Sequence, residues 1–302
     1  MNRDYRNMTQ ETIFTRKRDP FPDRFRDKVA IVTGGSTGIG KGIVEELCRE
    51  GAKVTFTGRT EATGKETEDE LKNAGHDVFF VSGDMIKEDF CKEVVDKTVR
   101  KWGRINYLVN NAYRFIDKGR DATEQDWYNV LFTGPVAYAR MMANCTPHMI
   151  NEGGGAIVNI SSISAHIAQP NRWTYNASKG AVHVLTMCAA IDLAPLNIRV
   201  NEVSPGTIWT RETLRGVWDA PPDVREAFFG EMNRRQMMQR CGEPVETAGA
   251  VLFFLSGDAS FITGHELLVD GGFVNMGQQG IKETALVQDA ESKSKTEQGG
   301  VK

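Results

Sequence analysis

The sequence predicts an α/β fold in which helices flank both faces of a seven-stranded, doubly wound parallel sheet. Strand-like apolar runs alternate with helix-like periodic segments from Lys28 to about Gly272. A glycine-rich turn also joins the first apolar run to the first periodic segment. Right-handed crossovers between consecutive strands then wind the sheet in both directions, with ligand at the carboxyl ends of the strands. The predicted strands are 29–33, 53–57, 78–82, 107–110, 156–160, 198–203 and 266–269.

The first βα turn has the composition of a dinucleotide cradle. It runs from Thr33 to Gly40, after the apolar run 29–32 and before the helical spacing of Ile39, Ile43 and Leu47. The N–H groups at a helix start can hold a pyrophosphate, and glycine lets that anion approach the backbone. An ordinary glycine-rich turn is the alternative, but the following strand at 53–57 completes a βαβ unit and favours the cradle.

A second segment predicts a proton-transfer centre. The strand at 156–160 ends in Ser161 and Ser162, and a loop then leads to a helix that carries Tyr175 and Lys179. Residues four apart share one helix face, so the ammonium can approach the phenol. Tyrosine with its usual pKa near 10 is a poor base, and a neighbouring cation favours the phenolate. Taken alone, Tyr-x-x-x-Lys is more often an ordinary helix surface.

Together these residues resemble the short-chain dehydrogenases/reductases in their single-domain, Rossmann-like form. The resemblance covers about Asp27 to Gly272. It includes the TGxxxGxG turn, the YxxxK pair, Asn110-Asn111-Ala112, Ile198-Arg199-Val200-Asn201 with Ser204-Pro205-Gly206, and Ile262-Thr263-Gly264 with Val269-Asp270-Gly271-Gly272. The resemblance implies that Tyr175 exchanges the substrate proton, that Lys179 lowers its pKa and binds the nicotinamide ribose, and that Ser162 hydrogen-bonds the carbonyl.

The resemblance also implies the cofactor-binding residues. They are Gly34, Ser36, Thr37, Gly38, Ile39, Gly40, Asn111, Ala112, Tyr175, Lys179, Pro205 and Gly206. Asp84 matches the family's adenine contact, with a helix N-cap as its alternative. Ile208 and Thr210 match the positions that meet the nicotinamide carboxamide, with loop packing as theirs.

The residue after the second strand selects the form of the nicotinamide cofactor. An acid there accepts hydrogen bonds from a ribose 2′-hydroxyl, whereas arginine pairs with a 2′-phosphate. This chain has Gly58-Arg59 and no acid until Glu61. We therefore expect Arg59 to favour NADP(H) over NAD(H), with a solvated surface arginine as the alternative.

Two positions depart from the family pattern. The family's fourth catalytic residue, an asparagine that holds a water near the lysine, aligns with Gly134, or with Leu131 in a shifted alignment. Neither side chain can bind a water, so Asn129 or Asn144 would substitute, or backbone and water would form the relay. Tyr113 replaces the usual glycine after Asn110-Asn111-Ala112 and either narrows the site or packs within its loop.

Composition excludes several other classes. With 37 basic and 40 acidic residues the net charge is −3, and no basic stripe favours nucleic acid as a partner. The five cysteines are scattered without disulfide or zinc-site spacing, so no metal is predicted. An N-terminus without an apolar core and the absence of long apolar stretches argue against secretion and membrane insertion. A cytoplasmic protein is expected.

The chain divides into a core and two ends. Residues 1–26 are predicted to be an N-terminal extension, 27–273 one domain, and 274–302 a polar tail that is disordered for lack of apolar surface. Residues 207–240 contain tryptophan, phenylalanine and methionine and predict a substrate lid, with core-packing helices as the alternative. As a lid, they suggest a substrate with apolar bulk.

These observations predict an NADP(H)-preferring oxidoreductase that moves hydride between nicotinamide and a secondary alcohol or ketone. The alternative is a weakly catalytic sensor or scaffold that binds a dinucleotide, which the Gly134 departure would permit. The resemblance further implies a homotetramer or homodimer, for which residues 177–193 could supply a face. Substrate and physiological direction depend on pocket shape.

Overall fold

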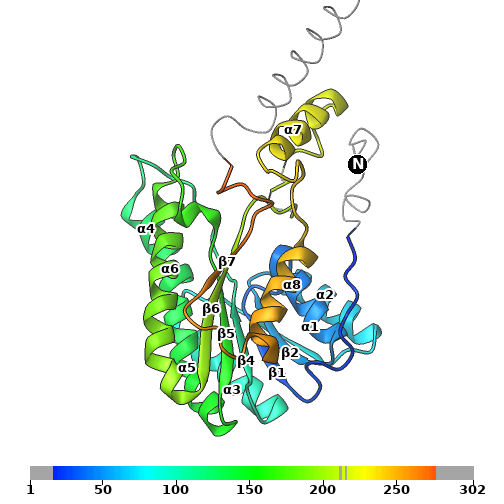
Figure 1. Ribbon diagram of the computed structural model, residues 1–302, viewed down its shortest axis with the longest axis vertical. Coiled ribbons are helices and arrows are strands. Elements are labelled where there is room, and N and C mark those ends of the chain that lie inside the picture. The colour runs from blue at the N-terminus through cyan, green and yellow to red at the C-terminus, as the bar shows by residue number, and fades with distance from the viewer. Residues whose placement is uncertain (1–15, 211–212, 215, 277–302) are drawn as a thin grey trace, which may run out of the picture.

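The computed structural model describes residues 16–210, 213–214 and 216–276. Within these residues, seven parallel strands form one sheet in the order β3-β2-β1-β4-β5-β6-β7 (Figure 1). The strands are β1 Val29–Val32, β2 Lys53–Gly58, β3 Val78–Ser82, β4 Tyr107–Asn110, β5 Gly155–Ile160, β6 Ile198–Pro205 and β7 Glu266–Val269. The predicted doubly wound fold is confirmed.

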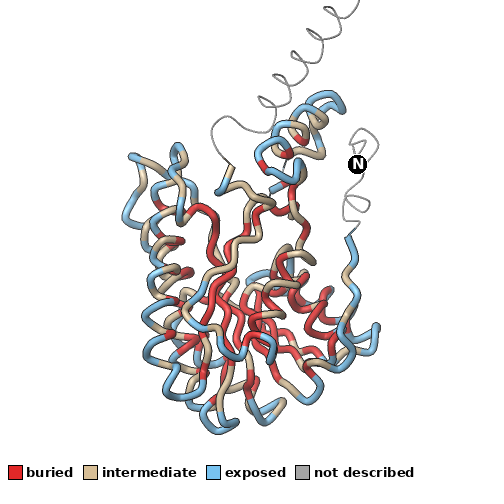
Figure 2. The backbone as a smooth tube through the Cα atoms, viewed as in Figure 1, coloured by how far each residue is buried: buried red, intermediate tan, exposed pale blue. Residues whose placement is uncertain are grey.

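Helices cover both faces of the sheet. One hydrophobic cluster joins the sheet to α1, α2 and α8, and a second joins it to α3, α5 and α6. Figure 2 shows the resulting burial, concentrated in the strands and in the inner sides of the helices. The helices are α1 Gly38–Arg49, α2 Glu61–Asn73, α3 Glu88–Trp102, α4 Glu124–Leu131, α5 Ala137–Asn151, α6 Trp173–Leu193, α7 Pro222–Arg234 and α8 Pro244–Leu255. A five-residue π-helical turn, Phe132–Val136, joins α4 to α5.

The strand order reverses between β1 and β4, and this reversal positions the site. The chain moves outward from β1 through β2 to β3, then returns to place β4 on the other side of β1. The connections after β1 and β4 therefore leave the sheet in opposite directions and open a crevice at its carboxyl edge, where ligands bind in such sheets.

Part of the predicted N-terminal extension packs on the domain. Phe25 is fully buried and belongs to the core cluster that includes α1. The fully buried carboxylate of Glu50 pairs with Arg18 and, at 2.6 Å, with Arg24. Residues 16–26 therefore form a strap held by a buried ion-pair network, which composition alone did not indicate.

The segment predicted to be a lid forms its own small core. Trp209, Leu214, Phe229 and Cys241 are buried together, and α7 carries several of the surrounding apolar side chains. Figure 1 shows α7 set apart from the sheet, beyond one end of the strands. Of the predicted disordered tail 274–302, residues 277–302 lie outside the described residues.

Helix α6 combines a functional face with an apolar exposed one. Val182, Thr186 and Ala190 are buried, whereas Val184 and Ile191 are 53% and 75% exposed. Among the described residues, only the segment Trp173–Leu196 is long and apolar enough to cross a membrane, on length and composition alone. One such helix is weak evidence for a membrane span, and α6 packs against β6 and the loop after β5.

Candidate active site

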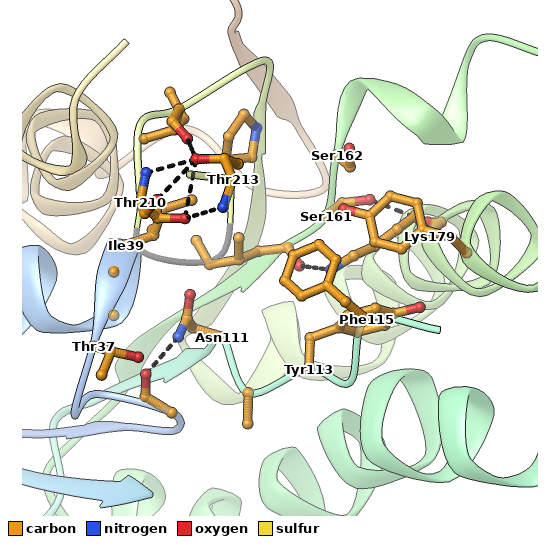
Figure 3. A pocket seen from close by; sticks show the side chains of 18 of the residues that line it. Thr37, Ile39, Asn111, Tyr113, Phe115, Ser161, Ser162, Lys179, Thr210 and Thr213 are labelled. Atoms are coloured by element: carbon orange, nitrogen blue, oxygen red, sulfur yellow. Dashed lines mark hydrogen bonds between the residues drawn. The ribbon is translucent and has the colours of Figure 1, made fainter. Parts of the chain in front are cut away.

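A cavity of about 560 Å³ opens at the carboxyl edge of the sheet. Every residue predicted to bind cofactor or to act in catalysis lines it, from Gly34 in the glycine turn to Thr210 beyond β6. Figure 3 shows Thr37 and Asn111 toward one end of this cavity and Ser162 and Lys179 toward the other. The fold therefore unites the two motifs that the sequence keeps more than a hundred residues apart.

The glycine turn is built for close backbone approach. Gly34 has a φ of +66°, and a Cβ there would lie 2.9 Å from the Ala112 Cα atom. Asn111 closes the turn, because its Nδ2 atom donates to the carbonyl oxygens of Thr33 and Gly34 at 3.0 Å. A side chain at Gly34 would separate these two segments.

The start of α1 is free to hold an anion. Its N-cap residue, Thr37, forms no side-chain capping hydrogen bond, so the first N–H groups of the helix lack that partner. Ser36, Thr37 and Ile39 line the cavity beside them. These donors fit the pyrophosphate of a nicotinamide dinucleotide.

The three predicted catalytic side chains lie together at the other end of the cavity. Ser162 follows β5, Tyr175 and Lys179 project from α6, and all three are less than a tenth exposed. The Lys179 Nζ atom donates to the Ile160 carbonyl oxygen at 2.9 Å. The Ser162 Oγ atom accepts a hydrogen bond from the Ser164 backbone N–H at 3.1 Å.

Burial governs the protonation of this centre. It raises the pKa of Tyr175, while hydrogen bonding to Ser162 and the charge of Arg172 oppose that rise. Burial also lowers the pKa of Lys179 to about 7, against the attraction of Glu202. Burial is the largest influence on both groups, and the lowering of the phenol pKa by Lys179 stays a prediction.

Comparison with known proteins agrees with this geometry. A family model described as enoyl-(acyl carrier protein) reductase matches residues 34–274. The cyclopentanol dehydrogenase of Comamonas testosteroni is 36% identical over 258 residues, covering 83% of this chain and 98% of that protein. The 7α-hydroxysteroid dehydrogenase of Clostridium sardiniense is 35% identical, and the match covers 83% of this chain and 94% of that protein. The L-fucose dehydrogenase of Bos taurus is 35% identical, and the match covers 82% of this chain and 90% of that protein.

This chain belongs to the short-chain dehydrogenase/reductase family. Membership identifies it as an oxidoreductase that uses NAD(P) and acts on small molecules. The predicted family resemblance is confirmed.

One departure from the family pattern has a structural counterpart. At Gly134, which aligns with the family's asparagine, the surroundings are crowded, because a Cβ there would lie 2.8 Å from the Ser178 Oγ atom and 3.4 Å from the Tyr113 ring. Tyr113 occupies the adjoining volume, and the Lys179 Nζ atom lies 4.3 Å from the centroid of its ring. The buried hydroxyls of Tyr113 and Ser178 are neighbours, yet neither completes a hydrogen bond within the described residues.

The two asparagines considered as substitutes do not line the cavity. Asn129 lies on α4, where its side-chain oxygen accepts a hydrogen bond from Gln125 at 3.1 Å. Asn144 lies on α5 and, like Leu131, is absent from the cavity wall. The side chains next to Gly134 are therefore the Ser178 hydroxyl and the ring of Tyr113.

The end of the cavity that contains Asp84 has an ion pair that sequence reasoning missed. Asp84 lines the cavity as predicted, and its carboxylate pairs with the Arg114 guanidinium. Arg59 also lines this end and is exposed. A Cβ at Gly58 would lie 2.5 Å from the Ser36 Oγ atom, so Ser36 leaves little space for an acidic side chain there.

Two further residues form a wall beside the reactive phenol. Phe115 stacks on the Tyr175 ring with centroids 5.6 Å apart and planes 17° apart, although it is 57% exposed. Tyr113 meets the same ring edge to face at 5.2 Å. Tyr113 and Phe115 lie one and three residues after Ala112. These two aromatic residues just after the motif were the sequence signal for this wall.

The lid segment reaches the cavity with only some of its side chains. Ile208, Thr213, Met232 and Arg235 line the wall, together with Phe273. The tryptophan and phenylalanine rings of the segment pack in their own cluster instead. They stabilise the segment, so its aromatic content is not a guide to substrate bulk.

Proposed function

We propose that this protein is an NADP(H)-preferring carbonyl reductase that interconverts a ketone and a secondary alcohol. The observation that carries the proposal is the presence of Ser162, Tyr175 and Lys179 in the same cavity as an uncapped helix start behind a glycine turn. A catalytically weak sensor or scaffold would need the helix start that binds the dinucleotide, but it has no evident need for the three side chains.

The protonation of Tyr175 favours the direction of carbonyl reduction. Its raised pKa keeps the phenol protonated at neutral pH, as a proton donor to a carbonyl oxygen must be. Ser162 then donates a hydrogen bond to the same oxygen and stabilises negative charge as it develops. When bound, the nicotinamide dinucleotide supplies the hydride.

Tyr113 takes over the positioning of Lys179 in this proposal. A cation over the face of a desolvated aromatic ring is stabilised by about 2 kcal/mol. The ring therefore holds the amine of Lys179 where the family uses an asparagine and a water. The hydrogen bond that the Lys179 Nζ atom donates to the Ile160 carbonyl oxygen holds the amine from another side.

Arg59 is proposed to select NADP(H). Its guanidinium can pair with a 2′-phosphate, and the crowding at Gly58 disfavours the carboxylate that would bind a 2′-hydroxyl. Losing hydrogen bonds to a charged group costs about 1.5–3 kcal/mol, so Arg59→Ala should lower kcat/KM with NADPH roughly 10- to 150-fold. The value with NADH should change little, and a wild-type enzyme equally active with both cofactors would contradict the selection.

The proposed substrate is an alicyclic ketone or secondary alcohol. The exposed face of Phe115 next to Tyr175 offers a flat apolar surface beside the reacting carbonyl. Two relatives carry names that specify such compounds, cyclopentanol and a 7α-hydroxysteroid. Cyclopentanone and a bulkier cyclic ketone are therefore the first substrates to assay.

The decisive experiment compares wild type with Tyr175→Phe by nicotinamide absorbance. General acid catalysis contributes typically 10²–10⁴-fold, so kcat should fall by about that factor while cofactor affinity is retained. Turnover that survives the substitution would reject the proton-donor role. Cofactor binding without turnover of any cyclic ketone would favour the sensor.

The exposed apolar face of α6 is the proposed contact between subunits. Val184, Met187 and Ile191 are each more than 40% exposed on this face. A second copy of α6 would bury them, consistent with a homodimer or a homotetramer.

A further inference from the structure

A cluster of histidine and glutamate side chains lies outside the residues that line the active-site cavity. It contains His166 from the β5–α6 loop, His183 from α6, Glu202 from β6 and Glu266 from β7. Because these residues come from four elements, their spacing in the sequence gives no sign of the cluster.

The donor atoms of these side chains converge. His166 Nε2 lies 2.7 Å from Glu266 Oε1, and His183 Nδ1 lies 3.2 Å from Glu202 Oε2 and 3.6 Å from Glu266 Oε2. One donor atom from each of His166, His183 and Glu266 lies within 4.8 Å of the other two. Ligands about 2.0–2.1 Å from a tetrahedral zinc ion lie about 3.3 Å apart. The 3.2 and 3.6 Å separations around His183 are close to that value, and the 2.7 Å pair of His166 and Glu266 would have to open by about half an ångström.

Glu202 is the anchor of the cluster. Its side chain is 1% exposed, and its Oε1 atom accepts a hydrogen bond from Ser204 at 3.1 Å, which leaves Oε2 directed toward His183. Glu266 is 15% exposed, so two carboxylates converge with little water around them. A divalent cation would neutralise both charges in a way that a single imidazole cannot.

We infer that His166, His183, Glu202 and Glu266 form a binding site for a divalent transition-metal ion of the zinc class. Zinc binds a donor set of two imidazole nitrogens and two carboxylate oxygens. Magnesium and calcium prefer sites made of oxygen ligands alone. The side chains of His166 and His183 are 28% and 29% exposed, which leaves a path by which the ion can enter.

The ion would act as a clamp on the catalytic elements. His166 lies four residues after Ser162, and His183 lies one helical turn after Lys179. Ligation would therefore tie the loop after Ser162 and the helix of Lys179 to strands β6 and β7. The inference concerns a structural site and stands whether or not the proposed reaction is correct.

Cobalt(II) spectroscopy of the full chain, without any added histidine tag, tests this inference. After treatment with a chelator, Co²⁺ should bind at one equivalent and give the intense visible absorption of a tetrahedral N/O site. Zn²⁺ should abolish that absorption, and Mg²⁺ should not. At a hundredfold excess of free Zn²⁺ over its dissociation constant, the melting temperature should rise by about 5 °C.

His166→Ala and His183→Ala should each remove the absorption and the thermal shift. His166 lies in a partly exposed loop, so its variant keeps the test valid if the α6 variant fails to fold. His76→Ala, before the strand at the opposite edge of the sheet, is the matched control and should retain both. Co²⁺ that keeps the weak spectrum of the hydrated ion, or that binds equally after either cluster substitution, would show that these residues form ion pairs only.

Discussion

If Tyr113 positions Lys179, removing its ring should lower activity, whereas no such loss is expected if Tyr113 only packs within its loop. The Lys179 amine lies 4.3 Å from the centroid of the Tyr113 ring, and the family's asparagine position beside it holds only hydrogen. A buried cation–π contact contributes about 2 kcal/mol, and each 1.36 kcal/mol of transition-state stabilisation is a factor of ten. Tyr113→Gly should therefore lower kcat roughly 30-fold.

The matched variant Tyr113→Phe separates the ring from its hydroxyl. The hydroxyl completes no hydrogen bond within the described residues, so its removal should leave kcat within about threefold of wild type. Cofactor dissociation constants, measured by NADPH fluorescence, should stay unchanged in both variants, because the ring acts on the position of the amine. A kcat loss in Tyr113→Phe equal to that in Tyr113→Gly would assign the effect to the hydroxyl and refute this reasoning.

The reciprocal substitution completes a double-mutant cycle. Gly134→Asn places a Cβ 2.8 Å from Ser178 Oγ and an amide against the Tyr113 ring, so by itself it should also lower kcat. The double variant Tyr113→Gly/Gly134→Asn provides the glycine and the asparagine of the family pattern. The Ser178 hydroxyl can rotate away from the new Cβ at position 134 and relieve that contact. The double variant should be more active than either single variant, whereas simple additivity would mean that the two positions are independent.

Three further predictions concern stability and assembly. Glu50→Gln removes the buried charge that holds two arginines of the N-terminal strap and should cost about 3–5 kcal/mol in urea unfolding. Glu45→Gln, in helix α1 just before it and 38% exposed, should cost under about 1 kcal/mol. Because burial lowers the pKa of Lys179 to about 7, the unfolded chain keeps this proton to higher pH. The stability of wild type relative to Lys179→Met should therefore rise as the pH increases from about 7 toward 10, and a flat difference would contradict a desolvated amine. Ile191→Glu places a charge on the exposed apolar face of α6 and should shift the mass measured by light scattering toward the monomer; an unchanged mass would move the subunit contact elsewhere.

The fold was predictable because its signals are local and repeated. Strand β2 was predicted at 53–57 and observed as Lys53–Gly58, and right-handed crossovers limit the orders in which the strands can lie. The glycine turn, Ser162, Tyr175 and Lys179 were also accessible, since each motif uses residues close together in the chain. The roles assigned to them stay predictions.

Local sequence patterns were enough to predict the parallel sheet, the glycine turn at the start of α1 and the residues that line the cavity, because apolar periodicity and short motifs act over one or two turns of chain. Packing in three dimensions established which groups face Lys179, how burial shifts the pKa of Tyr175, and that His166, His183, Glu202 and Glu266 converge. Those properties depend on distances between elements far apart in the chain and on the water that packing removes, and neither quantity is encoded in local spacing.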